Sequence, residues 1–205
     1  TFDLVVFGAF TRLTDSGLGC PDWPGCYGNS NPLHALGEIQ QAEQLLPDGP
    51  VTVMKAWIEM IHRYLAMTVG ALILVQVGVA FAKLKSLGKG PLLGSLGLLL
   101  LVCIQGAFGA WTVTLKLQPI IVSLHLILAL LLLAALTTYA QQFWVEKNSS
   151  VRVLRLRPVP GLLWLSAFAI LFCQIFLGAW VSTNYAVLAC PDFPTCLGSA
   201  WPETN

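Results

Sequence analysis

Long apolar stretches separated by short polar ones dominate this chain. Apolar runs lie approximately at 56–82, 91–115, 119–145 and 159–185. Each is long enough to cross a bilayer as a helix, which takes about 20 residues. A further run at 2–10 is too short to cross alone, and we interpret it as the end of a truncated membrane helix. The pattern predicts an all-α integral membrane protein.

Composition supports this class and excludes others. The 205 residues are 56% hydrophobic and only 10% charged, whereas a soluble domain carries about 25% charged residues. The net charge is +1, so there is no electrostatic case for a nucleic-acid partner. The chain shows no signal peptide, and we expect the membrane helices themselves to direct insertion.

The basic residues predict an orientation. Two loops, 83–90 and 146–158, hold seven of the eleven lysines and arginines: Lys83, Lys85, Lys89, Lys147, Arg152, Arg155 and Arg157. Loops rich in lysine and arginine stay in the cytoplasm. The segments 11–55 and 186–205 are then periplasmic, or extracellular, loops of a protein in a bacterial cytoplasmic (inner) membrane.

Four of the six cysteines fall in these outward segments, as Cys20/Cys26 and Cys190/Cys196. Such pairs oxidise readily outside the cytoplasm, so we predict two disulfides with Cα atoms within about 7 Å. The spacing leaves open whether each is a structural staple or a redox-active pair. Cys103 and Cys173 lie within predicted helices, and we expect both to be buried there as small apolar side chains.

An internal repeat predicts the domain organisation. Cys20-Pro-Asp-Trp-Pro-Gly-Cys26 matches Cys190-Pro-Asp-Phe-Pro-Thr-Cys196 at an offset of 170, and Gly8-Ala-Phe matches Gly178-Ala-Trp. Residues 1–145 then form a four-helix bundle with a truncated first helix, the outer loop 11–55 and the helices 56–82, 91–115 and 119–145. The cytoplasmic loop is 146–158. Residues 159–205 start a second, incomplete bundle with its first helix and outer loop.

Two histidines lie at matching depths in separate apolar runs. His62 follows Ala56 by six positions (62 − 56), and His125 follows Pro119 by six (125 − 119). An ionisable side chain inside a membrane helix is a functional-site hypothesis by default. The pair is suited to clamping a metal or a haem iron. The alternative is that each ring makes hydrogen bonds inside the bundle.

Two charged residues accompany His62. Glu59 precedes it by one helical turn and shares its face, so it can orient the imidazole, accept a proton or lie in the headgroup region. Arg63 can extend to the surface or pair with a propionate of a haem. Small residues at Gly106, Gly109 and Gly178 are expected to allow close helix packing. Residues 36–46 are typical of a short amphipathic helix that lies on the membrane or covers a site.

Several motifs in order resemble the haem A synthase family. The opening is Gly8-Ala-Phe-Thr-Arg-Leu-Thr-Asp-Ser-Gly-Leu18, followed by Trp23. Glu59-x-x-His62-Arg63 is similar to the family's second-helix motif. Gln105-Gly-x-x-Gly-x-Trp-Thr-Val113, then Pro119 and His125-Leu126, is similar to its third and fourth helices. The resemblance covers nearly the whole chain.

This resemblance implies a fold and an activity. Its members have eight membrane helices in two four-helix bundles related by a pseudo-twofold, and each bundle supplies two histidines to a haem. His62 and His125 would hold the substrate, haem O, with Glu59 as the catalytic carboxylate and Arg63 beside it. Cys20 and Cys26 would be the loop pair of bacterial members. The family oxidises a methyl group of haem O to the formyl group of haem A, for cytochrome oxidase maturation.

The second half of such a protein would bind haem b, and its histidines are not in this chain, so the chain alone is expected to be inactive. Expected partners are membrane lipid, a haem O synthase, an electron acceptor that the sequence does not identify, and a second copy in a homo-oligomer. Three other functions stay open: a di-haem cytochrome b-like electron carrier, a membrane thiol-disulfide oxidoreductase, and a haem or lipid transporter. The repeat and the Glu-x-x-His-Arg motif favour the synthase.

Overall fold

The computed structural model describes residues 1–47, 49–147, 161–192 and 194–200, without the side chains of 144–147, and helices are the regular elements of these residues. Its helices are α1 (Phe2–Leu13), α2 (Leu36–Leu45), α3 (Val53–Ala82), α4 (Leu84–Leu87), α5 (Lys89–Thr114), α6 (Pro119–Lys147) and α7 (Gly161–Thr183). Helices α3, α5, α6 and α7 are long and apolar enough to cross a membrane. The prediction of an all-α integral membrane protein is therefore confirmed.

Helix ends differ from the predicted ranges where a polar residue caps or extends a helix. Helix α3 begins three residues before the apolar run (56 − 53), because the Thr52 hydroxyl accepts the Lys55 N–H at 3.2 Å and caps it. Helix α1 continues past the apolar run to Leu13. The predicted cytoplasmic loop 146–158 lies outside the described residues except for its first two positions, which end α6.

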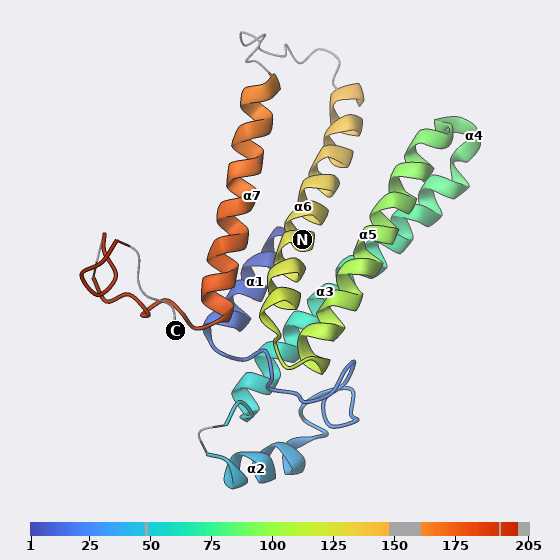
Figure 1. Cartoon of the computed structure of the whole chain (residues 1–205). Helices are drawn as coiled ribbons and strands as arrows, with labels where there is room; N and C mark the ends of the chain where they lie inside the picture. The colour runs from blue at the N-terminus through green and yellow to red at the C-terminus, as the bar shows by residue number, and fades with distance from the viewer. Residues whose placement is uncertain (48, 148–160, 193, 201–205) are drawn as a thin grey trace.

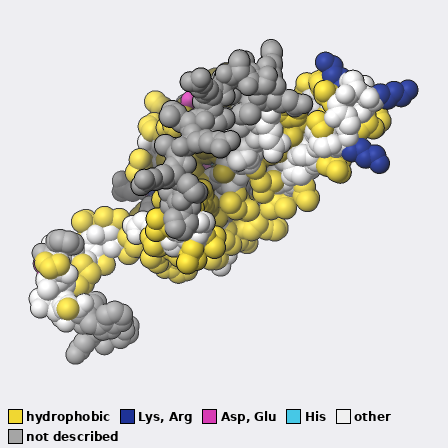
Figure 2. Space-filling model, turned by 90° about the horizontal axis from the view of Figure 1, so that it is seen from above, with side chains coloured by type: hydrophobic (Ala, Val, Ile, Leu, Met, Phe, Trp, Pro, Cys, Tyr) yellow, Lys and Arg dark blue, Asp and Glu magenta, His cyan; other side chains and the backbone are white. Residues whose placement is uncertain are grey.

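The long helices lie side by side, and the two ends of the molecule differ in character (Figure 1). Helix α5 packs on both α3 and α6, while α7 packs on α6 and α1 on α3. One end, here called the loop end, carries α2 and the segment that joins α1 to α3. The opposite end, the lysine end, carries α4 with exposed lysines at 83, 85 and 89 (Figure 2).

Buried side chains gather in two clusters with a loosely packed layer between them. The loop-end cluster contains Cys20, Cys26, Ala35, Ile39, Ala56 and Met60. The lysine-end cluster contains Ile73, Leu98 and Leu132. Between them α3 has no buried residue from 64 to 72, and α5 has none from 99 to 112. We call this region the middle layer.

A polar network ties the helices together near the lysine end. The Tyr139 hydroxyl of α6 lies 2.8 Å from Ser95 Oγ of α5 and donates to the carbonyl of Pro91 at 3.0 Å. Gln76 of α3 donates to the same serine oxygen at 3.2 Å. Ser95 is fully buried. Interhelical hydrogen bonds of this kind hold membrane helices in register.

Helices α1, α5 and α7 end in the same way. Each ends five residues after a glycine: Gly8 before Leu13, Gly109 before Thr114 and Gly178 before Thr183. Two residues further on, Asp15, Lys116 and Tyr185 have φ values between 51° and 53°. The following amides return to the last helical turn, Ser16 to Thr11, Leu117 to Thr112 and Ala186 to Val181. This is the pattern of a Schellman C-terminus.

Two expectations about small residues are wrong. Cys103 and Cys173 are exposed on their helices rather than buried. In a membrane protein an apolar residue gains little by facing inward, because lipid is as apolar as the bundle interior. Gly106 and Gly178 have no described atom within 4 Å of a Cβ position, so they make no close helix contact there.

Candidate functional site

The loop after α1 is closed by the first predicted disulfide. The Cα atoms of Cys20 and Cys26 are 4.9 Å apart, and those of Cys190 and Cys196 are 4.6 Å apart, so both disulfide predictions are confirmed. Cys20 and Cys26 are fully buried. Cys190 is exposed. The first disulfide is part of the loop-end cluster, where it packs against α2 and α3.

The two loops have the same internal structure. The Asp22 carboxylate accepts the N–H groups of Tyr27 and Gly28 at 2.6 and 2.8 Å. In the second loop, Asp192 accepts those of Leu197 and Gly198 at 2.6 and 2.9 Å. Thr195 and these two amides lower the pKa of Asp192 by hydrogen bonding. Burial raises the pKa of Tyr27.

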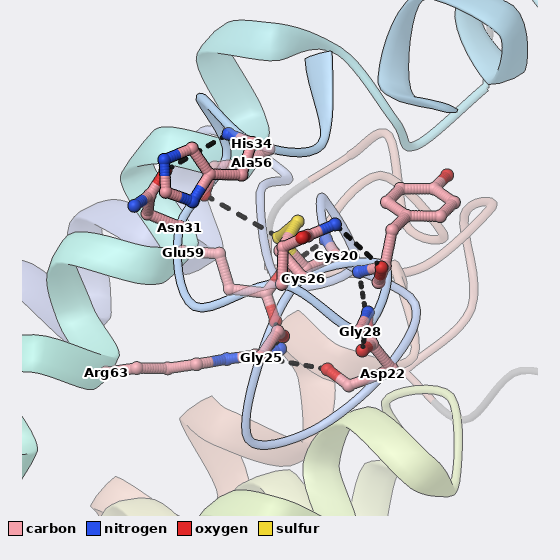
Figure 3. The surroundings of a disulfide bond; sticks show 12 residues. Cys20, Asp22, Gly25, Cys26, Gly28, Asn31, His34, Ala56, Glu59 and Arg63 are labelled. Carbon is pink, nitrogen blue, oxygen red and sulfur yellow. Dashed lines mark hydrogen bonds and ion pairs between the residues drawn. A yellow bond between two sulfur atoms is a disulfide. The ribbon is translucent and has the colours of Figure 1, made fainter. Parts of the chain in front are cut away.

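Glu59 and Arg63 join α3 to the first loop, and we call this pair with its loop contacts the latch (Figure 3). Glu59 is 4% exposed, accepts the Cys20 N–H at 2.8 Å and forms an ion pair with Arg63. The Arg63 guanidinium also donates to the carbonyls of Asp22, at 2.8 Å, and of Pro24 and Gly25. Both charged side chains are thus buried and satisfied by the loop, which seats the disulfide over the end of α3.

His62 lies one residue from the latch, against α1 and beside the loop-end cluster that contains Met60. Its ring is parallel to that of Phe7 within 10°, with centroids 6.4 Å apart. A Cβ on Gly8 would lie only 3.0 Å from its Nε2. The absence of a side chain at position 8 therefore allows the imidazole to approach the α1 backbone.

His125 is placed on α6 in a closely related way, against α5. A Cβ on Gly109 would lie 3.3 Å from its Cε1 and 3.9 Å from its Nε2. Gln105 donates to the backbone carbonyl of His125 at 3.1 Å, and its amide nitrogen lies 3.5 Å from His125 Nε2. Three polar atoms here are buried without a hydrogen-bond partner among the described residues: His125 Nδ1, Gln105 Oε1 and Ser123 Oγ. Unpaired buried polar atoms are rare in proteins and call for an explanation.

Two apolar recesses flank α1, one of about 450 Å³ beside Phe2, Val6 and Phe10, and neither includes His62 or His125. The shared cavity between the imidazoles therefore stays a prediction. The residues nevertheless fit a haem. They offer two imidazoles, unpaired polar atoms at His125, a middle layer without buried side chains on α3 and α5, and apolar neighbours.

A further polar cluster joins α1 to α7 at the loop end. Arg12 donates to the Ser182 carbonyl at 2.6 Å and lies 4.5 Å above the Tyr185 ring. The Tyr185 hydroxyl donates to Asp15 at 2.9 Å, and this bond raises the tyrosine's pKa. Both hydrogen bonds join residues 170 positions apart. They therefore join equivalent positions of the repeat, as expected where a twofold axis passes between two copies.

The sequence predicted Glu59, His62 and Arg63 on one membrane helix, where the structure has them. It did not predict the residues of other helices that surround them. The roles of Gly8, Gln105 and the Arg12 cluster depend on contacts across helices that local spacing does not reveal. One signal was present: a glycine–alanine–aromatic triplet occurs at Gly8, Gly109 and Gly178, each five residues before the end of a helix, and once more at Gly106, one turn earlier on α5. His34 is exposed in the loop.

Comparison with known proteins places these features in a family. The family model of the COX15-CtaA cytochrome oxidase assembly proteins matches residues 1–205. The chain is 43% identical to the haem A synthase of Shewanella oneidensis over 97% of its length and 58% of the relative's. It is 31% identical to that of Caulobacter vibrioides over 98% of its length and 62% of the relative's. It is 30% identical to the haem A synthase of Alkalihalophilus pseudofirmus over 95% of its length and 60% of the relative's.

No solved structure matches the chain. The chain spans about three fifths of the length of the curated relatives it matches. The family model nevertheless covers all 205 residues, and the loop disulfides and apolar helices of the structure agree with it. The chain therefore belongs to the COX15-CtaA family of cytochrome oxidase assembly proteins.

Proposed function

We propose that the protein carrying this chain is a haem A synthase, an oxidoreductase that converts a methyl group of haem O to the formyl group of haem A. The observation that carries this proposal is the pair His62 and His125, from two different helices, each lying against a helical glycine at the same distance from the loop end. The curated names of the relatives point to the same reaction.

His62 and His125 would bind the iron of the substrate haem through neutral imidazoles. The middle layer would shield the porphyrin from water, because its walls are apolar and its helices stand in lipid. Holding the haem in one orientation would place one ring methyl group near Glu59. The iron and an external electron acceptor supply the redox chemistry.

Glu59 would be the catalytic carboxylate that accepts protons as the methyl group is oxidised. Its position supports this role, since it precedes His62 by one helical turn and is buried at the loop end. Arg63 would hold the Glu59 carboxylate in position through their ion pair. Its guanidinium is already occupied by the loop carbonyls, so contact with a haem propionate would have to share these bonds.

The finer setting follows from the same proposal. The loop end would face the periplasm, and the lysine end the cytoplasm, of a bacterial inner membrane, in line with the exposed lysines on α4. Haem O is strongly apolar, so a haem O synthase in the same membrane is the expected supplier. The second half of the protein would hold haem b, and a second copy of the protein would be its partner in a homo-oligomer.

Rival functions predict different products. A thiol-disulfide oxidoreductase needs sulfur atoms that a partner thiol can reach. Cys20 and Cys26 are fully buried, so this function would fall to the second pair, in which Cys190 is exposed. A cytochrome b-like carrier or a haem transporter would use the same histidines and leave the haem unmodified. Extraction of the bound haem followed by mass analysis separates both from a synthase.

The test uses two variants of the full gene product, produced together with haem O synthase. Glu59→Gln keeps the shape of the side chain but removes the base, so we expect retained haem and a loss of haem A. His62→Ala removes a ligand, so we expect loss of haem itself. Haems are extracted, separated by chromatography and quantified per protein.

The wild-type protein and a Glu38→Gln variant, changed in the exposed face of α2, serve as controls. A normal haem A yield from Glu59→Gln would remove the catalytic role of the carboxylate. Unmodified haem from the wild type, with haem O supplied, would contradict the synthase proposal.

A further inference from the structure

The turn that joins α3 to α5 carries three lysines at the lysine end. Lys83 follows the last residue of α3, Lys85 lies in α4, and Lys89 is the first residue of α5. All three are exposed, and Figure 2 shows the lysine side chains extending outward from this end of the molecule. The turn is closed by its backbone, because the N–H of Leu87 donates to the carbonyl of Lys83 at 2.9 Å. The three ammonium groups are therefore presented together on one hydrogen-bonded turn.

No acidic side chain neutralises these lysines within the described part of the chain. None of the three forms an ion pair or a side-chain hydrogen bond there. The sequence has no aspartate or glutamate between Glu59 and Glu146, so the two helices that meet at the turn supply no carboxylate beside it. The turn is thus a site of uncompensated positive charge.

The same turn lies at the boundary of the membrane. It connects two of the helices that are long and apolar enough to cross, Val53–Ala82 and Lys89–Thr114. At about 1.5 Å per residue α4 is about 6 Å long, and the headgroup layer is about 5–8 Å thick on each side of a bilayer. Leu84 and Leu87 lie between the lysines, and Leu87 is 48% exposed. Apolar and cationic side chains therefore alternate at the depth of the headgroups.

We propose that this turn binds anionic phospholipids, with the ammonium groups of Lys83, Lys85 and Lys89 around the headgroup phosphates and Leu87 against the acyl chains. Basic residues beside a membrane helix attract anionic headgroups, and a lysine reaches them while its stem stays on apolar surface. An acidic soluble protein fits less well, because it would have to enter the headgroup layer to reach so short a turn. The site does not involve haem, so it stands or falls separately from the proposed function.

The expected strength follows from the number of lysines. Each basic residue near an anionic surface strengthens binding about fivefold, so the three together should contribute about 10²-fold. The attraction is electrostatic and should weaken with salt, since about 1 M salt shortens the screening length to about 3 Å. Phosphatidylcholine, whose headgroup has no net charge, should not distinguish the lysines from neutral residues.

The experiment measures lipid binding at the turn itself. The full gene product in detergent micelles is titrated with photoreactive phosphatidylglycerol, and the labelled peptides from the turn are quantified by mass spectrometry. Exchange of Lys83, Lys85 and Lys89 together for glutamine should raise the lipid concentration at half-maximal labelling about 10²-fold, and each single exchange about fivefold. Labelling by photoreactive phosphatidylcholine should stay the same.

Two control proteins separate this site from a general effect of charge. Lys55→Gln combined with Lys116→Gln removes lysines at the loop end, and exchange of the three turn lysines for arginine keeps their charge. Both proteins should be labelled like the wild type. Wild-type labelling of the triple glutamine variant, or an equal loss in the loop-end control, would overturn the proposal. If the triple variant does not insert, the single variants decide, and the absence of a loss in all three would overturn it as well.

Competition identifies the natural occupant. Inorganic phosphate and polyglutamate, each added at the ionic strength of a sodium chloride control, should displace no more label than the chloride does. Stronger displacement by phosphate would assign the turn to a free anion, and stronger displacement by polyglutamate would assign it to an acidic protein. Either result would overturn the lipid proposal.

Discussion

The latch predicts that Arg63 protects the first disulfide from reduction. Cys20 and Cys26 are fully buried, so a thiol reductant reaches them only when the loop opens. Arg63→Ala leaves Glu59 buried without its ion-pair partner and removes the donor to the carbonyls of Asp22, Pro24 and Gly25. The loop should therefore open far more often in this variant.

The magnitude follows from the burial of the pair. Removing one partner of a buried ion pair costs about 3–5 kcal/mol, and each 1.4 kcal/mol is about a factor of ten in an equilibrium. The open population, and with it the reduction rate, should rise roughly 10²- to 4 × 10³-fold. Glu59→Gln keeps an oxygen to accept the Cys20 N–H but loses the charge, and should raise the rate only about tenfold.

The assay follows both disulfides in one molecule. The protein is treated with dithiothreitol for increasing times, free thiols are alkylated, and the peptides that contain each pair are quantified by mass spectrometry. The second pair, Cys190 and Cys196, is an internal control, because the structure shows no contact between Arg63 and the described part of its loop. An unchanged rate at the first pair in Arg63→Ala would refute the latch. Equal acceleration at both pairs would show general unfolding instead.

Two further changes test the packing around the site. Gly19→Ala would place a Cβ 2.5 Å from the Lys55 carbonyl carbon and should lower stability by about 1–3 kcal/mol, measured as thermal unfolding in detergent. Gly37→Ala, with nothing within 4 Å, is its control, and equal stability of the two variants would contradict the expected clash. Tyr139→Phe breaks the hydrogen bonds to Ser95 and Pro91. It should lower the free energy of unfolding, measured by denaturation in mixed micelles, by about 0.6 kcal/mol and at most about 1.7 kcal/mol. Ser166→Ala, which removes only a hydrogen bond within α7, is its control, and indistinguishable unfolding curves would show that the network adds no stability.

Local patterns predicted the parts of the fold that depend on local physics. The length of an apolar run is enough to place α3, α5, α6 and α7, because a bilayer requires about 20 apolar residues. The five-residue spacing of Cys20 and Cys26 is enough to predict a disulfide. Spacing along α3 likewise brings Glu59, His62 and Arg63 onto neighbouring turns, which is why the candidate site could be named from the sequence.

What the sequence could not reveal depends on contacts between distant segments. Arg63 was expected to reach the surface or a propionate, but the folded loop presents carbonyls that bind its guanidinium. The contact between Gly8 and His62 joins residues on different helices, and a glycine carries no side-chain signal of its role. Cys103 was expected to be buried but is exposed. Lipid surrounding the helices is as apolar as their interior, so it removes the driving force for placing an apolar side chain inside.

The hydrogen bonds between α1 and α7 bear on how such a protein arose and avoids pairing with itself. Where two copies of one ancestral sequence meet across an axis, identical residues face each other. Here the facing positions have diverged, with Arg12 opposite Ser182 and Asp15 opposite Tyr185. Two first halves placed together would lose the Tyr185 ring beneath Arg12 and the Tyr185 hydroxyl that donates to Asp15, so these two contacts would be missing from the wrong pairing. The tyrosine at position 185, where the first half has Asp15, thus favours pairing of each half with the other rather than with a copy of itself.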